Sequence, residues 1–368
     1  MADQFSTQCI PISQRPVIVS RAMKQPVLGI IATLLVCAVS LALISLFSFP
    51  MFAGWVSYFL LCIIPMQIVM LALWRTGQPR FAAAQKQPMK GILITLCAFI
   101  WGAAVAAVYF MTVGGNINPP APMLIMFCIV SVPVTFFLCI VWGGWPANAV
   151  VKNPVGAGLL QLVGGYVLNY LLFRTLFNYG FMQGAPVYVP ALDPQGFFNA
   201  WKILVFYISV LAAMFFVIDF DLWPFTKFPK LMKQPALGTV WMLTILAVGG
   251  IAFYIGTVVM AMDPVIYFVR VPVAYLFGSI VVLNMFQNSL FAKLPQPTKG
   301  VLNAIATITF GSALAWVYRL AMPAVTGALA SGPPPYDAEI WLASALLSVT
   351  FPFLVFYSDF FDFWPLKK

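Results

Sequence analysis

The chain alternates between long apolar runs and short polar joints. Because a helix needs about 20 residues to cross the hydrocarbon core of a bilayer, each long run predicts a transmembrane helix. The ten runs lie at about 27–49, 54–74, 90–112, 121–142, 155–179, 198–217, 235–261, 264–288, 298–323 and 339–364. The predicted fold class is therefore an all-α integral membrane protein with about ten transmembrane helices.

The polar joints repeat. The motif KQP..G occurs at Lys24–Gly29, Lys86–Gly91 and Lys233–Gly238, QPTKG follows at Gln296–Gly300, and a degenerate copy, KNPVGAG, lies at Lys152–Gly158. Successive joints are one helical hairpin apart, and such self-similarity is typical of repeat architectures. We expect a cytoplasmic N-terminal segment, 1–24, and a single transmembrane domain, 25–368. Its five tandem hairpins are placed at about 25–74, 87–142, 153–224, 234–291 and 296–366.

The two helices of a hairpin differ in composition. Span 90–112 holds nine Gly, Ala, Ser or Thr residues, whereas its partner 121–142 holds three. Small residues let membrane helices approach closely, so we expect an inner ring of the five odd-numbered helices surrounded by the even ones. Aromatic runs such as Phe136–Phe137 and Phe215–Phe216 then suit lipid or subunit contact. In the alternative, an irregular bundle, the small residues reflect tight pairing alone. The even helices carry mid-span prolines at Pro65, Pro133, Pro272 and Pro352.

Five hairpins around a five-helix pore are also the architecture of the plant guard-cell anion channels and their bacterial tellurite-resistance relatives. The chain resembles them in the number and order of its hairpins over the whole length, and it matches none of their sequence motifs. The resemblance therefore implies form alone, and no functional residue is carried over from it.

Composition and charge agree with a membrane protein. Apolar residues make up 62% of the chain and charged residues 8%, whereas soluble globular proteins have roughly 25% charged residues. The net charge of +10 is distributed unevenly. On a ten-span chain, fifteen basic residues fall on one side and four on the other, so the positive-inside rule places both termini in the cytoplasm. The fifteen are Arg15, Arg21, Lys24, Arg75, Arg80, Lys86, Lys90, Lys152, Lys227, Lys230, Lys233, Lys293, Lys299, Lys367 and Lys368.

The motifs of common catalytic and metal sites are absent from the sequence. The chain has no histidine, and HExxH, GxSxG, P-loop and Rossmann patterns do not occur. The six cysteines are scattered without a C-x-x-C pair and are interpreted as small apolar fillers: Cys9, Cys37, Cys62, Cys97, Cys128 and Cys139. We predict neither an enzyme nor a metal, cofactor or nucleic-acid partner.

The four basic residues on the sparse side are Arg174, Lys202, Arg270 and Arg319. Charge inside the membrane is costly and is usually paired, buried in the bundle or functional. One hypothesis is an external vestibule that binds a small anion, with arginine supplying planar donors. The alternative is local salt bridges, together with snorkelling to lipid headgroups. The external carboxylates available for such bridges are Asp193, Asp263, Asp337 and Glu339.

Two further polar sets have alternative interpretations. Mid-helix amides could bind a polar substrate or join helices; they are Gln67, Gln161, Asn169, Asn284 and Asn303. Acids near the cytoplasmic ends of two helices could line a cytoplasmic mouth or act as anchors beside lysines; they are Asp219, Asp221, Asp359 and Asp362.

The sequence favours membrane transport of a small solute, anionic or neutral, through a passive channel or uniporter of a cell inner membrane. The expected partners are the lipid bilayer, the solute, and either a homo-oligomer or a larger membrane complex. The alternative is a non-catalytic membrane subunit or scaffold of a larger inner-membrane complex.

Overall fold

The computed structural model describes residues 23–333 and 335–367. Arg15, Arg21, Lys368 and Cys9 lie outside this range. Within it, ten helices are long and apolar enough to cross a membrane, which confirms an all-α multi-pass protein. We number them spans 1 to 10: Val27–Ile44, Phe49–Ala72, Met89–Met111, Pro122–Val141, Pro154–Leu176, Ala200–Asp219, Ala236–Val259, Pro264–Met285, Thr298–Thr326 and Asp337–Phe360.

Five of these spans are single α-helices: α1 (Val27–Ile44), α5 (Met89–Met111), α8 (Pro154–Leu176), α9 (Ala200–Asp219) and α13 (Thr298–Thr326). The other five combine α-helical segments with wider π-helical turns. Span 2 comprises α2 (Phe49–Met51), η1 (Phe52–Val56) and α3 (Ser57–Ala72). Span 4 comprises α6 (Pro122–Phe136) and η2 (Phe137–Val141). Span 7 comprises α10 (Ala236–Tyr254) and η7 (Ile255–Val259). Span 8 comprises α11 (Pro264–Phe268), η8 (Val269–Val273), α12 (Ala274–Ile280) and η9 (Val281–Met285). Span 10 comprises α14 (Asp337–Ala343), η10 (Ser344–Thr350), α15 (Phe351–Val355) and η11 (Phe356–Phe360).

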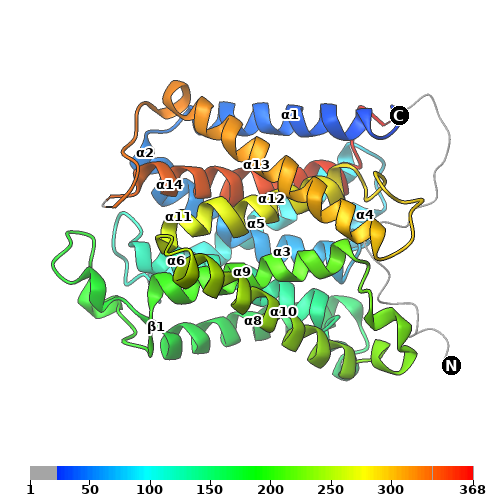
Figure 1. The fold of residues 1–368 in the computed structure, drawn as a ribbon, viewed down its shortest axis with the longest axis horizontal. Coiled ribbons are helices and arrows are strands. Elements are labelled where there is room, and N and C mark those ends of the chain that lie inside the picture. Colours follow the sequence, from blue (N-terminus) through cyan, green and yellow to red (C-terminus); the bar gives the residue numbers. More distant parts are fainter. Residues whose placement is uncertain (1–22, 334, 368) are drawn as a thin grey trace.

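The connections hold only short elements. One parallel pair of two-residue strands, β1 (Phe177–Asn178) and β2 (Phe198–Asn199), closes the long loop between spans 5 and 6. The remaining helical turns are α4 (Arg80–Ala83), α7 (Ala147–Val150), η3 (Gly180–Met182), η4 (Pro190–Leu192), η5 (Phe225–Lys227) and η6 (Pro229–Met232). Figure 1 shows the long helices side by side, with the start of α1 and the C-terminus at the same end of the bundle. We call this end, where the odd spans begin, the joint end and the opposite one the loop end.

The order of the two rings is the reverse of the predicted one. The most apolar window of each even span is 61 to 78% buried, whereas that of each odd span is only 17 to 44% buried. The even spans therefore form the inner ring and contact their even neighbours in the order 2, 4, 6, 8, 10 and back to 2. The prediction of an inner ring of odd helices was wrong.

The small residues of the odd spans serve a different contact. Each odd span packs in the groove between two even spans, which belong to the two hairpins that precede its own around the ring. Span 5, for example, belongs to the third hairpin and contacts span 4 of the second and span 2 of the first. Gly102 of α5 lies directly on Ile63 of α3, and Gly249 of α10 lies on the backbone of Val210 in α9. The small residues thus mark one face of an outer helix, and the rest of that helix is exposed.

The repeated joints connect the hairpins to one another. In each of the four joints that carry Gln-Pro, the glutamine Oε1 accepts a hydrogen bond from the glycine N–H four residues later, at 3.0–3.1 Å. Its Nε2 donates two hairpins back around the ring, to a carbonyl at the end of an even span in three of the joints and to the Asp221 carboxylate in the fourth. Gln25 donates to the carbonyl of Met285 at 2.8 Å, and Gln87 donates to that of Phe360 at 2.6 Å. One side chain thereby caps its own helix and satisfies the C-terminal group of another.

The third joint uses a different donor for the same purpose. Asn153 replaces the glutamine, and its Oδ1 caps α8 by accepting from the N–H of Val155 at 3.0 Å. The link to the other hairpin comes from Trp74, whose indole N–H donates to the carbonyl of Pro154 at 2.9 Å. All five joints also bury a glycine against an aromatic ring that follows an even span: Phe286, Phe361, Trp74, Trp142 and Phe220.

Candidate functional site

The inner ring encloses a cavity on its axis. Its volume is about 30 Å³, and side chains from all five even spans bound it. Its walls are apolar, with residues such as Leu71, Ile140 and Ile218, and its polar lining groups are Gln67 and Asn284. These residues belong to the second halves of their spans, so the cavity lies toward the joint end.

Three phenylalanine rings close this cavity toward the middle of the bundle. Phe136 lies edge-on to Phe215 with ring centroids 5.4 Å apart, and to Phe351 with centroids 6.2 Å apart. All three side chains are buried and line the cavity. The expectation that Phe136–Phe137 and Phe215 face lipid or other subunits was therefore wrong for these residues, because their spans are inside the bundle. Phe216, the neighbour of Phe215, is exposed.

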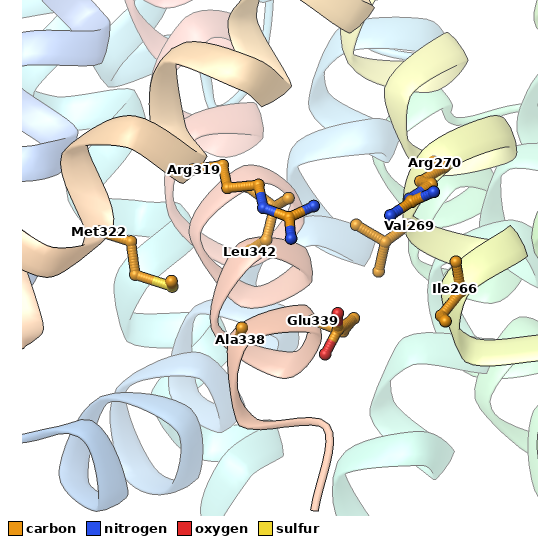
Figure 2. A pocket seen from close by; sticks show the side chains of 8 residues that line it. All are labelled: Ile266, Val269, Arg270, Arg319, Met322, Ala338, Glu339 and Leu342. Atoms are coloured by element: carbon orange, nitrogen blue, oxygen red, sulfur yellow. The ribbon is translucent and has the colours of Figure 1, made fainter. Parts of the chain in front are cut away.

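A second cavity lies at the loop end, between spans 8, 9 and 10. Its volume is also about 30 Å³. Arg270 of η8 and Arg319 of α13 extend into it from opposite sides, with Glu339 of α14 between and below them (Figure 2). The apolar residues that complete its lining are Ile266, Val269, Met322, Ala338 and Leu342.

The carboxylate in this cavity already accepts hydrogen bonds from two neighbouring residues. Glu339 is only 8% exposed; its Oε1 accepts from Ser331 Oγ at 2.6 Å, and its Oε2 from the N–H of Gly332 at 3.2 Å. Among the described residues, neither arginine forms an ion pair. Two guanidinium groups and one carboxylate leave a local excess of one positive charge.

Two further acids of the loop end, Asp263 and Asp193, are also engaged in local hydrogen bonds. Asp263 caps α11 through the N–H groups of Val265 and Ile266, and it accepts from the Tyr336 hydroxyl at 2.7 Å. Burial, and then this bond to Asp263, raise the pKa of Tyr336 to about 12, so Tyr336 remains a protonated donor at neutral pH. Asp193 accepts from the Tyr179 and Gln195 N–H groups and the Tyr188 hydroxyl. Within the described chain, no salt bridge joins these acids to Arg174, Lys202, Arg270 or Arg319, so the alternative of local salt bridges is not supported.

Arg174 and Lys202 do not line the cavity that holds Arg270 and Arg319. Arg174 lies in the last turn of α8 and Lys202 in the first turn of α9, and both side chains are exposed. They flank the β1–β2 pair of the long loop, where the Lys202 N–H donates to Asn199 Oδ1 at 3.2 Å. The four predicted site residues therefore occupy two separate places instead of one shared vestibule.

The five buried amides all join helices. Gln67 donates to the carbonyl of Pro352, Gln161 to that of Leu138, Asn169 to that of Phe127 and Asn303 to that of Asp219, over 2.8–3.3 Å. Asn284 donates to Asp359 Oδ2 at 2.8 Å. In each case the partner belongs to another span, which is the helix-joining role expected of amides in an apolar bundle.

The acids of the joint end separate into two groups. Asp221 and Asp362 pair with Lys299 and Lys367 at 2.7 and 2.9 Å, which agrees with anchors beside lysines. Asp219 is fully buried instead. The sequence analysis treated these acids alike; the spacing of Asn303 and Thr307, one helical turn apart on the span that meets Asp219, was a signal that could have separated them.

Comparisons of this chain with protein-family models, with curated proteins and with solved structures give no match.

Proposed function

We propose that the chain lets a small anion or neutral solute cross the membrane passively, along the axis of the inner ring. The observation that supports this proposal best is the axial cavity, because a space bounded by all five even spans is where a solute path through such a ring has to run. Its apolar wall, interrupted by Gln67 and Asn284, suits a weakly hydrated solute.

In this proposal the structure represents a closed state. Phe136, Phe215 and Phe351 fill the axis beside the cavity. Hydrophobic constrictions block conduction by excluding water, and a change in a few side-chain rotamers is enough to widen them. The π-helical turns η2 and η10 lie directly beside Phe136 and Phe351 and give the inner spans irregular backbone at this level.

The arginine pair is proposed to favour anions at the loop end. Arg270 and Arg319 are not neutralised within the described chain, and Coulomb attraction is stronger beside an apolar wall than in bulk water. The pair lies between spans 8, 9 and 10 rather than on the axis, so it is proposed to concentrate the anion near the entrance. Arginine offers a carboxylate or another oxyanion a planar pair of donors.

Flux in reconstituted vesicles tests the proposal. Arg270→Gln and Arg319→Gln are expected to lower anion flux several-fold at low salt and less at high salt, because salt screens the attraction. Arg174→Gln is the matched control, since Arg174 is an external arginine outside the cavity. Vesicles that remain tight to small anions and neutral solutes, with the protein folded and correctly inserted, would contradict transport.

The second candidate is a non-catalytic subunit of a membrane complex. The filled centre of the inner ring favours it, because a scaffold needs no solute path. It predicts that Phe215→Ala changes neither flux nor growth, and that the chain co-migrates with partner chains at fixed stoichiometry in native gels. A chain that runs as a monomer and conducts solutes excludes this candidate.

A further inference from the structure

Asp219 is a fully buried acid, and its neighbour Asp221 is neutralised by a lysine. Asp219 ends α9, and its side chain is 0% exposed. Two residues later, Asp221 accepts from Lys299 Nζ at 2.7 Å and from Gln296 Nε2 at 2.9 Å. Among the described residues no lysine or arginine pairs with Asp219. A buried carboxylate without a compensating charge is costly.

The hydrogen bonds around Asp219 leave two oxygens without a partner. Oδ2 of Asp219 accepts from the Tyr275 hydroxyl at 2.7 Å and from Thr307 Oγ1 at 3.5 Å. Its Oδ1 is buried and has no donor. The side-chain amide of Asn303 donates to the backbone carbonyl of Asp219 at 3.3 Å and to Asn288 Oδ1 at 2.9 Å. Its own Oδ1 is also buried without a donor.

The electrostatic field around Asp219 favours binding of a cation. Asp219 is the last residue of a helix, where the helix dipole is negative and cations are stabilised. The charged and titratable groups facing it are Tyr275 from α12, Asp221 from the same connection and Lys299 from α13. Lys299 is held by Asp221, so the charge of Asp219 remains to be balanced.

We propose that Asp219 Oδ1 and Asn303 Oδ1 are the protein ligands of a binding site for one alkali cation. Both are hard oxygen donors, which suit alkali and alkaline-earth ions rather than transition metals. One carboxylate charge matches a monovalent ion, since Ca²⁺ sites in proteins generally combine several carboxylates. Helix ends with carbonyl and side-chain oxygens hold Na⁺ in membrane proteins by the same chemistry.

The proposed ion would bind two hairpins directly, and the hydrogen bonds of its ligands reach a third. Asp219 belongs to the third hairpin, Tyr275 and Asn288 to the fourth, and Asn303 and Thr307 to the fifth. Binding only to the folded bundle, the cation would stabilise the meeting point of spans 6, 8 and 9. This role is independent of the transport proposal and would hold for a scaffold as well.

Thermal unfolding of the purified full-length chain tests the site. The midpoint is expected to rise by about 2–4 °C in NaCl or KCl relative to choline chloride of the same ionic strength. Asp219→Asn and Asn303→Leu are expected to abolish this difference. Asp362→Asn, which removes an acid that follows span 10 and pairs with Lys367, is expected to retain it.

A direct binding measurement on the unsubstituted chain keeps the proposal testable even where a variant does not fold. Radioactive ²²Na⁺ should bind at a stoichiometry near one and be displaced by unlabelled NaCl. Equal midpoints in all three salts, together with no bound ²²Na⁺, would overturn the proposal. So would an infrared carboxylic-acid band at neutral pH that disappears in Asp219→Asn, because a proton would then fill the site instead of an alkali cation.

Discussion

Gly278 of α12 and Gly311 of α13 lie against each other where spans 8 and 9 cross. A Cβ on Gly278 would overlap the carbonyl oxygen of Thr307, and a Cβ on Gly311 would overlap that of Ala274. Neither clash can be relieved by turning a side chain, because both obstacles are backbone atoms. This crossing is the closest approach between an inner and an outer span that the glycines mark.

Gly311→Ala is therefore expected to destabilise the bundle. Overpacking of a well-filled contact typically costs about 1–3 kcal/mol, and the midpoint of thermal or SDS-induced unfolding should fall accordingly. Gly164→Ala in α8 is the control, because a Cβ there meets nothing within 4 Å. An unchanged midpoint for Gly311→Ala would show that the two helices do not approach as closely as described.

Gln87→Ala is expected to lower the free energy of unfolding by about 1–3 kcal/mol, because it orphans the carbonyl of Phe360 and the N–H of Gly91 together. Chemical unfolding of the variant in detergent measures the loss. Gln85→Ala is the matched control, since in the described part of the chain the Gln85 side chain makes one exposed hydrogen bond, to the carbonyl of Phe81 within its own turn. Equal losses for the two variants would argue against a linking role for the joint glutamine.

Phe215→Ala is expected to increase solute flux through reconstituted vesicles, because it removes one of the three rings that close the axial cavity. Phe216→Ala, one residue further along α9, is the control: its ring is exposed and does not line the cavity. Circular dichroism of both variants separates opening of the path from loss of fold. Higher flux for Phe216→Ala alone would place the path elsewhere.

The fifteen-to-four distribution of basic residues predicts that the loop end faces outward. Ala191→Cys in the long loop should react with a membrane-impermeant maleimide in intact cells. Ala149→Cys, near the joint end, should react only after permeabilisation; the unsubstituted chain serves as the blank. Labelling of both positions from one side only would refute the ten-span topology.

The sequence alone was sufficient for the spans and for the repeat. Ten apolar runs and five proline joints specify helices and hairpins through length and local chemistry, and the structure agrees with them closely. The inner and outer order could not be obtained in the same way. Lipid and protein interior are equally apolar, so hydropathy does not tell a buried helix face from an exposed one. Gly102 illustrates this: it packs on Ile63, while Leu96 and Ile100 of the same helix are exposed.

The candidate sites were predictable in part. The scarcity of basic residues at the loop end singled out Arg270 and Arg319, which the fold brings into one cavity, but it could not separate them from Arg174 and Lys202. That separation depends on which hairpins are neighbours in space. The axial phenylalanines and the Asp219–Asn303 contact likewise join residues from different hairpins, and no local pattern specifies such pairs.

The closure of the ring has a consequence for biosynthesis. The groove that receives span 1 is made by hairpins 4 and 5, so Gln25 reaches Met285, 260 residues later, and Gln87 reaches Phe360, 273 residues later. A chain leaving the ribosome therefore inserts its first two hairpins long before their partners exist. Until the last helix has entered the bilayer, spans 1 and 3 have lipid where the finished protein has neighbours, and a nascent chain stopped before residue 285 would lack the carbonyls to which both glutamines bind.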